Sequence, residues 1–139
     1  MRVIFVGVHN KPGLVPLCNS TKSGRLIDRV ALEIGCRWIK TNLYDVDYLP
    51  LIYADKVELA RDWQYKTNLA TGDIVVLLGK EVHENFINSS GVAILKFAHP
   101  ASKWSHVAMD EYVNEMVNAI RKEQANNKRN PFQSHQQLI

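Results

Sequence analysis

The sequence has few cysteines and no cluster of metal-ligating residues at a recognisable spacing. Its 139 residues include two cysteines, Cys18 and Cys36. Two are too few for a disulfide framework, and their spacing does not indicate an iron–sulfur cluster or a zinc site, which normally needs four ligands. A reducing compartment is the simplest interpretation. We therefore expect no disulfide, no metal and no cofactor.

Long apolar runs and a strong charge of one sign are also missing. No apolar run approaches the ~20 residues that span a bilayer, and the first residues do not have the layout of a signal peptide. We expect a soluble, intracellular protein of the cytoplasm that does not contact a membrane. The net charge is only +3. This permits a polyanionic partner such as DNA but does not require one.

Glycine is too sparse near the start for a nucleotide-binding fingerprint. The loop after the apolar run at residues 3–6 holds Gly7 and Gly13. It has neither the repeated glycines of a dinucleotide site nor the GK[ST] step of a phosphate loop. What it does have is a short apolar strand, a loop with glycine and proline, and then a helix. This layout is typical of a binding site at the carboxyl edge of a parallel sheet.

Strand and helix patterns alternate along the chain. The patterns predict strands over residues 2–6, 37–43, 73–78 and 91–97, and helices over residues 23–34, 53–64, 80–88 and 110–123. Such alternation predicts a parallel sheet covered on both faces. With right-handed crossovers, the fold class is α/β, a three-layer α/β/α sandwich with a four-stranded parallel sheet in the order 2-1-3-4. We expect one domain over residues 1–123 and a polar, frayed tail over residues 124–139.

The strand order reverses between the first and third strands, which places a crevice there. Three loops, at residues 7–23, 42–50 and 98–105, then border it. The polar and turn-forming residues that these loops bring together are Gly7, His9, Asn10, Pro12 and Gly13 from the first strand, Asn42 from the second, and His99, Pro100 and Ser102 from the fourth.

This ordered set resembles the uracil-DNA glycosylase superfamily over about residues 2–122. Residues 7–13 (GVHNKPG) are similar to its first motif, residues 41–43 (TNL) to its base-reading segment, and residues 99–102 (HPAS) to its last motif. Each motif alone is weak, and the order of the set adds specificity. The resemblance implies hydrolysis of the N-glycosidic bond of uracil or a modified pyrimidine in DNA, without a metal or cofactor.

The resemblance also implies a role for each residue. Asn10 would position water, His99 would stabilise the departing base, and Asn42 would read the base. Gly7, His9, Pro12 and Gly13 would complete the base site, and the DNA-contacting residues would be Ser23, Arg25, Ser102, Lys103 and Trp104. These types suit the chemistry, because a departing base gathers negative charge and an amide both donates and accepts hydrogen bonds. The base must first be flipped out of the helix.

The first motif departs from the strongly water-activating branches of that superfamily. They carry Asp or Glu where this chain has Asn10, and an amide can orient water but cannot act as a base. The motif is one residue longer than usual, and no aromatic residue for stacking a pyrimidine is evident in the loop. Two further functions therefore stay open: a catalytically silent nucleic-acid- or protein-binding module, and a nucleotide hydrolase or transferase that uses Asp45 and Asp47.

Purely structural roles are open for the same residues. Asn10 could support a left-handed turn, Asn42 could satisfy backbone groups, and His99 could sit in an ordinary turn. Ser102 could cap a helix, and Trp104 could pack against its neighbours. The basic residues around the expected crevice could track phosphates or could be scattered solubilising charges; they are Lys11, Lys22, Arg25, Lys40 and Lys103.

Overall fold

The structure is a computed structural model that describes residues 1–8, 14–44, 53–89 and 91–129. Its elements, in chain order, are β1 (Val3–Gly7), α1 (Lys22–Ile34), β2 (Trp38–Asn42), α2 (Tyr53–Thr67), β3 (Ile74–Leu78), α3 (Lys80–Asn85), β4 (Ala93–Phe97), the 3₁₀ helix η1 (Pro100–Ser102) and α4 (His106–Arg129).

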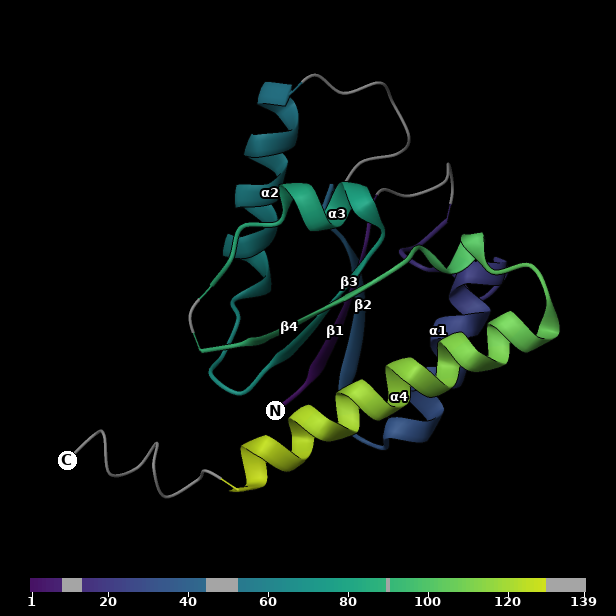
Figure 1. The fold of residues 1–139 in the computed structure, drawn as a ribbon. Helices are drawn as coiled ribbons and strands as arrows, with labels where there is room; N and C mark the ends of the chain where they lie inside the picture. The colour runs from purple at the N-terminus through teal and green to yellow at the C-terminus, as the bar shows by residue number, and fades with distance from the viewer. Residues whose placement is uncertain (9–13, 45–52, 90, 130–139) are drawn as a thin grey trace.

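The four strands form one parallel sheet in the order β2-β1-β3-β4. Helices α1 and α4 cover one face, and α2 and α3 cover the other (Figure 1). This arrangement confirms the predicted three-layer α/β/α sandwich and its strand order. Right-handed crossovers account for the two layers. The chain moves along the sheet in one direction from β1 to β2 and in the other from β2 to β3 and β4, so the connecting helices lie on opposite faces.

The two central strands form the core because they are apolar on both faces. Every residue of β1 and of β3 is buried. Side chains alternate along a strand, so Val3 and Phe5 pack with α1 and α4, while Ile4 and Val6 pack with α2 and α3. A continuous apolar run in the sequence is thus explained by a strand with a helical layer on each side.

Helix α1 follows the predicted pattern closely. The whole predicted apolar stripe is buried: Leu26, Ile27, Val30, Ala31 and Ile34. The helix begins one residue earlier than predicted, because the Thr21 hydroxyl accepts a hydrogen bond from the Gly24 N–H at 3.0 Å and caps it. Gly35 ends it in the left-handed region with φ +65°, as predicted.

Helix α4 is longer than predicted at both ends. It begins after Ser105, whose hydroxyl accepts from the Ala108 N–H at 3.0 Å. It continues through residues 124–129, so the expected fraying from residue 124 is wrong for this stretch. Two of the polar side chains there have partners: the Gln124 amide donates to Cys36 Sγ at 3.3 Å, and the Asn127 amide donates to the Gly72 carbonyl at 3.1 Å.

A partly buried ion pair ties the amino edge of the sheet together. Arg2 Nε lies 3.1 Å from Asp73 Oδ2, and Asp73 is buried. The same carboxylate accepts from the Ala70 N–H at 2.9 Å, and Arg2 Nη2 donates to the Thr67 carbonyl at 2.9 Å. The start of β1 is therefore fastened to the turn between α2 and β3.

Cys18 and Cys36 are both free thiols. Within the described ranges, none of the helices combines the length and apolar character that crossing a bilayer requires.

Helix α1 offers a matched test of the core. Ile27 is fully buried, whereas Leu32 on the same helix is 84% exposed. We expect Ile27→Ala to lower the free energy of unfolding by about 2–5 kcal/mol, because it removes buried methyl groups and leaves a cavity. Leu32→Ala should change it by less than about 0.5 kcal/mol. Urea unfolding followed by circular dichroism measures both, and equal effects would contradict the assigned burial.

Candidate functional site

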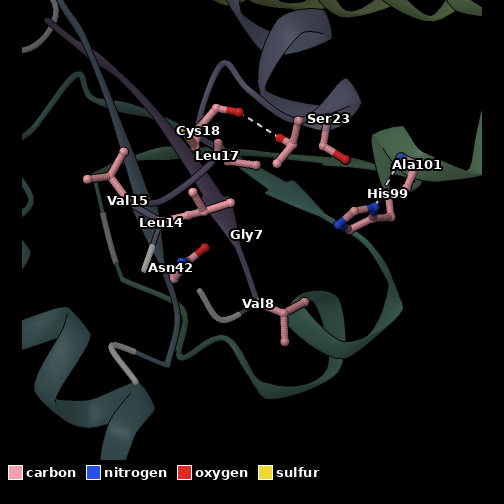
Figure 2. A pocket seen from close by; sticks show the side chains of 11 residues that line it. Gly7, Val8, Leu14, Val15, Leu17, Cys18, Ser23, Asn42, His99 and Ala101 are labelled. Carbon is pink, nitrogen blue, oxygen red and sulfur yellow. Dashed lines mark hydrogen bonds between the residues drawn. The ribbon is translucent and has the colours of Figure 1, made fainter. Parts of the chain in front are cut away.

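A pocket of about 380 Å³ opens at the carboxyl edge of the sheet, where β1, β2 and the segment after β4 meet (Figure 2). This volume lies within the range of small-molecule sites, about 300–1,000 Å³. The lining residues are Gly7, Val8, Leu14, Val15, Leu17, Cys18, Thr21, Ser23, Asn42, His99 and Ala101. The pocket therefore lies at the predicted crevice, and residues from three separate strand ends contribute to it.

Gly7 and Asn42 face each other at the ends of β1 and β2. They are register partners in the sheet, and Asn42 is 4% exposed. The Leu43 N–H continues the ladder by donating to the Gly7 carbonyl at 2.9 Å. A Cβ on Gly7 would lie only 2.7 Å from Asn42 Oδ1. The glycine thus leaves the space that the buried amide occupies.

His99 lies two residues after the end of β4 and caps η1. Its Nδ1 accepts a hydrogen bond from the Ala101 N–H at 3.1 Å. Nδ1 must therefore carry a lone pair, and the imidazole proton belongs on Nε2. Figure 2 shows Nδ1 turned toward Ala101 and the other ring nitrogen turned to the pocket side. This hydrogen bond favours the tautomer that carries its proton on Nε2, the ring nitrogen on the pocket side.

Gly79, just before α3, and His83, within α3, hold the backbone next to His99. The Gly79 N–H donates to the Phe97 carbonyl at 2.9 Å, and a Cβ on Gly79 would lie 3.3 Å from the His99 Cβ. His83 Nε2 lies 2.9 Å from the Phe97 carbonyl and 3.0 Å from the Leu77 carbonyl. Because carbonyl oxygens only accept, this nitrogen donates, and it holds the ends of β3 and β4 together.

A buried tyrosine hydroxyl fixes the backbone next to His99 from the other side. The Tyr112 hydroxyl donates to the Ala98 carbonyl at 2.6 Å. Burial raises the pKa of Tyr112 well above its ordinary value. The phenol therefore stays protonated and keeps its role as a donor.

The loop between β1 and α1 forms one wall of the pocket and is pressed against α1. A Cβ on Gly24 would lie 2.0 Å from the Cys18 carbonyl oxygen, so this contact needs glycine. Lys40 Nζ donates to the Leu17 carbonyl at 2.9 Å and pairs with the Asp28 carboxylate. Lys40 therefore holds the wall of the pocket in place, which fits neither of the two roles that the sequence left open for it, phosphate tracking and a solubilising surface charge.

The structure brings together part of the predicted base site. Gly7, Asn42 and His99 line one pocket, and Ser23 joins them from the first turn of α1. The remaining residues of the first motif, His9, Asn10, Pro12 and Gly13, lie outside the described residues, as do Lys11, Asp45 and Asp47. Their roles stay predictions.

The predicted DNA-contacting residues are spread over several places. Ser102 is the last residue of η1 and its hydroxyl donates to the His99 carbonyl at 2.7 Å, so its alternative as a helix cap is wrong. Lys103 Nζ lies 5.8 Å from the centre of the Tyr112 ring. Trp104 is 84% exposed, so its alternative as a packing residue is wrong too. Arg25 and Trp104 line a separate groove beside the pocket.

The apolar wall of the pocket was not predicted. Leu14, Val15 and Leu17 line it although they belong to no helix or strand. The signal in the sequence was the run LVPL at residues 14–17, inside an otherwise polar loop. Apolar side chains line most small-molecule pockets, which suits these loop residues to a role in binding.

Comparison with protein-family models and with curated proteins finds no match. The resemblance to the uracil-DNA glycosylases therefore depends on the sequence motifs alone. In the part of the chain that the structure describes, no group of three or more His, Cys, Asp or Glu could hold a metal ion.

Gly7→Ala tests the contact between Gly7 and Asn42. The added methyl group would meet Asn42 Oδ1 at 2.7 Å, so we expect a loss of about 1–3 kcal/mol in the free energy of unfolding. In the Asn42→Ala background the amide is gone, and the same substitution should cost clearly less. A double-mutant cycle by urea unfolding measures this coupling. Strictly additive effects would show that the two residues do not share this space.

Cys18 gives a test that depends on pH. Its Sγ lies 3.2 Å from the Ser20 hydroxyl, and this hydrogen bond, with one from the Ser20 backbone, lowers the pKa of the thiol. A lowered pKa means more thiolate near neutral pH. In a Cys36→Ser background, we expect Ser20→Ala to slow alkylation by iodoacetamide near pH 8, with the two rates converging once pH exceeds both pKa values. Superimposable pH profiles would contradict the hydrogen bond.

Proposed function

We propose that the protein is a DNA glycosylase that hydrolyses the N-glycosidic bond of uracil or a modified pyrimidine. One observation carries the proposal: a buried amide, Asn42, and an imidazole, His99, line one pocket beside the bare backbone of Gly7. They come from different strand ends and are 57 positions apart in the numbering. The sequence motifs point to the same residues.

The reaction would place negative charge close to His99. Water bonds to C1′ of the sugar as the bond from C1′ to the base nitrogen breaks, and the electron pair leaves with the base. That charge spreads onto a carbonyl oxygen of the ring, where an Nε2–H donor stabilises it. The base finally takes up the proton that water loses, so the products are the free base and an abasic sugar.

Asn42 would supply the specificity. Its amide can donate one hydrogen bond and accept another, as reading the edge of uracil requires. A pocket built for such a pair rejects a base whose donor and acceptor are exchanged, because buried polar groups are then left unpaired. The absence of a side chain on Gly7 leaves room for the amide in this position.

The apolar wall fits the faces of a single ring. Leu14, Val15 and Leu17 line the pocket. For a base that enters it, contacts with these apolar side chains would replace the stacking on neighbouring bases in DNA. A base cannot reach such a pocket from inside a duplex and must be extruded first. Asn10 would orient the attacking water by resemblance, and with an amide instead of a carboxylate we expect slow turnover.

A second candidate is a binding module on the same fold without catalysis. The observation that favours it is the lining of the pocket: the described residues around it include neither Asp nor Glu, and none of Phe, Tyr and Trp. Such a module would bind DNA with a salt-dependent affinity. Its binding would not change in Asn10→Ala, and it would form no product.

Excision assays separate the two candidates. Oligonucleotides that carry uracil, a mismatch, or hydroxymethylated or deaminated bases are incubated with the protein and treated with alkali. We expect strand breakage, and a single-turnover rate about 10²- to 10³-fold lower for His99→Ala, which loses the donor to the departing base. His106→Ala is the matched control, because His106 is exposed on α4.

Asn42→Ala should lose discrimination between bases as well as rate. Asn10→Ala should lower product formation. The absence of breakage with every lesion, together with DNA binding that Asn10→Ala leaves unchanged, would contradict catalysis and support the binding module. Turnover of free nucleosides without breakage of DNA would instead favour a nucleotide hydrolase or transferase.

A further inference from the structure

A second hollow, which we name the α1–Trp104 groove, lies beside the pocket. It has a volume of about 520 Å³ and is lined by Lys22, Arg25, Leu26, Arg29, Trp104 and Met109. The two hollows adjoin along the chain. Thr21 and Ser23 line the pocket on either side of Lys22, and Ala101 lines the pocket three residues before Trp104.

Three cations follow one face of α1 along this groove. Lys22, Arg25 and Arg29 are spaced i, i+3 and i+7, so they lie on the same side of the helix. At 1.5 Å per residue they cover about 10 Å of its length. A row of positive charges of this kind suits the backbone of a nucleic acid strand.

Two of these cations have partners that a phosphate could replace. Arg29 Nη2 lies 2.8 Å from Asp110 Oδ1, and the two side chains are 49% and 61% exposed. Such a pair in solvent contributes little to stability. Arg25 Nη1 donates to the Ser20 carbonyl at 3.1 Å, also at the surface. A bound phosphate could therefore replace the Asp110 carboxylate and the Ser20 carbonyl as partners of these guanidinium groups without disrupting the core.

The aromatic ring of the groove is exposed instead of buried. Trp104 is 84% exposed, and Lys22 Nζ lies 4.5 Å from the centre of its ring. Leu26 and Met109 provide apolar surface in the same groove. An exposed indole next to a row of cations is the combination with which proteins bind single-stranded nucleic acid, by stacking bases and tracking phosphates.

We propose that the α1–Trp104 groove binds an unpaired DNA strand, with a base stacked on Trp104 and phosphates on Lys22, Arg25 and Arg29. A base can stack on a side chain only when one of its faces is free. In a duplex both faces are covered by neighbouring base pairs, so the groove favours single-stranded DNA. Under the proposed function, this strand is the flank of the nucleotide in the pocket, and the protein prefers single-stranded substrates.

Binding measurements test the groove without depending on catalysis. Fluorescence anisotropy compares a labelled strand of about 15 ordinary nucleotides with its duplex. We expect tighter binding of the single strand, and about 5- to 100-fold weaker binding of it by Trp104→Ala. Trp104→Phe should retain most of the affinity, because a ring remains for stacking.

Trp38→Ala is the matched control for the aromatic ring. Trp38 is also exposed, at 41%, and also has a lysine near its ring, with Lys40 Nζ at 5.8 Å. It begins β2, at the opposite end of the strand from Asn42. Its substitution should leave the affinity for the single strand unchanged.

Charge substitutions test the row of cations. Arg25→Gln and Arg29→Gln should each weaken binding, and each should reduce the slope of log K against log salt by about 0.7. Asp110→Asn should strengthen binding, because it frees Arg29 from its partner. Arg61→Gln is the control, since Arg61 is exposed on α2 in the other helical layer.

The two proposals fail in different ways. Three results would contradict the proposal that the groove binds an unpaired DNA strand. They are an unchanged single-strand affinity in Trp104→Ala, equal affinity for strand and duplex, and stronger binding of an acidic peptide than of the strand. Single-strand binding that follows the predictions without excision of any base supports the groove and counts against the glycosylase. Excision from single-stranded DNA that Trp104→Ala leaves intact would support the glycosylase and contradict the proposal for the groove.

Discussion

The site depends on the parallel pairing of β1 with β2, which places Gly7 opposite Asn42. β1 is buried on both faces, so its residues are divided between two cores and its register is strongly specified. A shift by one residue would exchange the two faces and bring a valine, Val6 or Val8, opposite the amide. The core of the protein therefore determines the geometry of the pocket.

Three glycines give the site its shape through the side chains that they lack. Gly7 leaves room for the Asn42 amide, Gly24 lets the loop before α1 press on the helix, and Gly79 lies against His99. In each case a Cβ would be closer to its neighbour than ordinary packing permits. The polar groups of the pocket are thus held by close backbone contacts in addition to hydrogen bonds, which limits how far they can move.

The basic residues have two different physical roles that the net charge does not reveal. Arg2 and Lys40 are bound to carboxylates and carbonyls inside the framework, where they hold β1 and the pocket wall. Lys22, Arg25 and Arg29 lie along an open groove. A modest total of +3 is therefore compatible with a local row of cations suited to a polyanion.

The sequence by itself determined the elements, the strand order and the end of the sheet where the pocket lies. Apolar patterns such as residues 74–78 and the stripe on α1 predict which residues are buried. Right-handed crossovers then leave few possible strand orders for a chain of alternating strands and helices. Only the tertiary structure decided that Lys40 holds the pocket wall in place, that Leu14, Val15 and Leu17 form that wall, and that Trp104 is exposed beside the cations of α1. These properties depend on which distant segments meet a side chain, and no local pattern of residues records that.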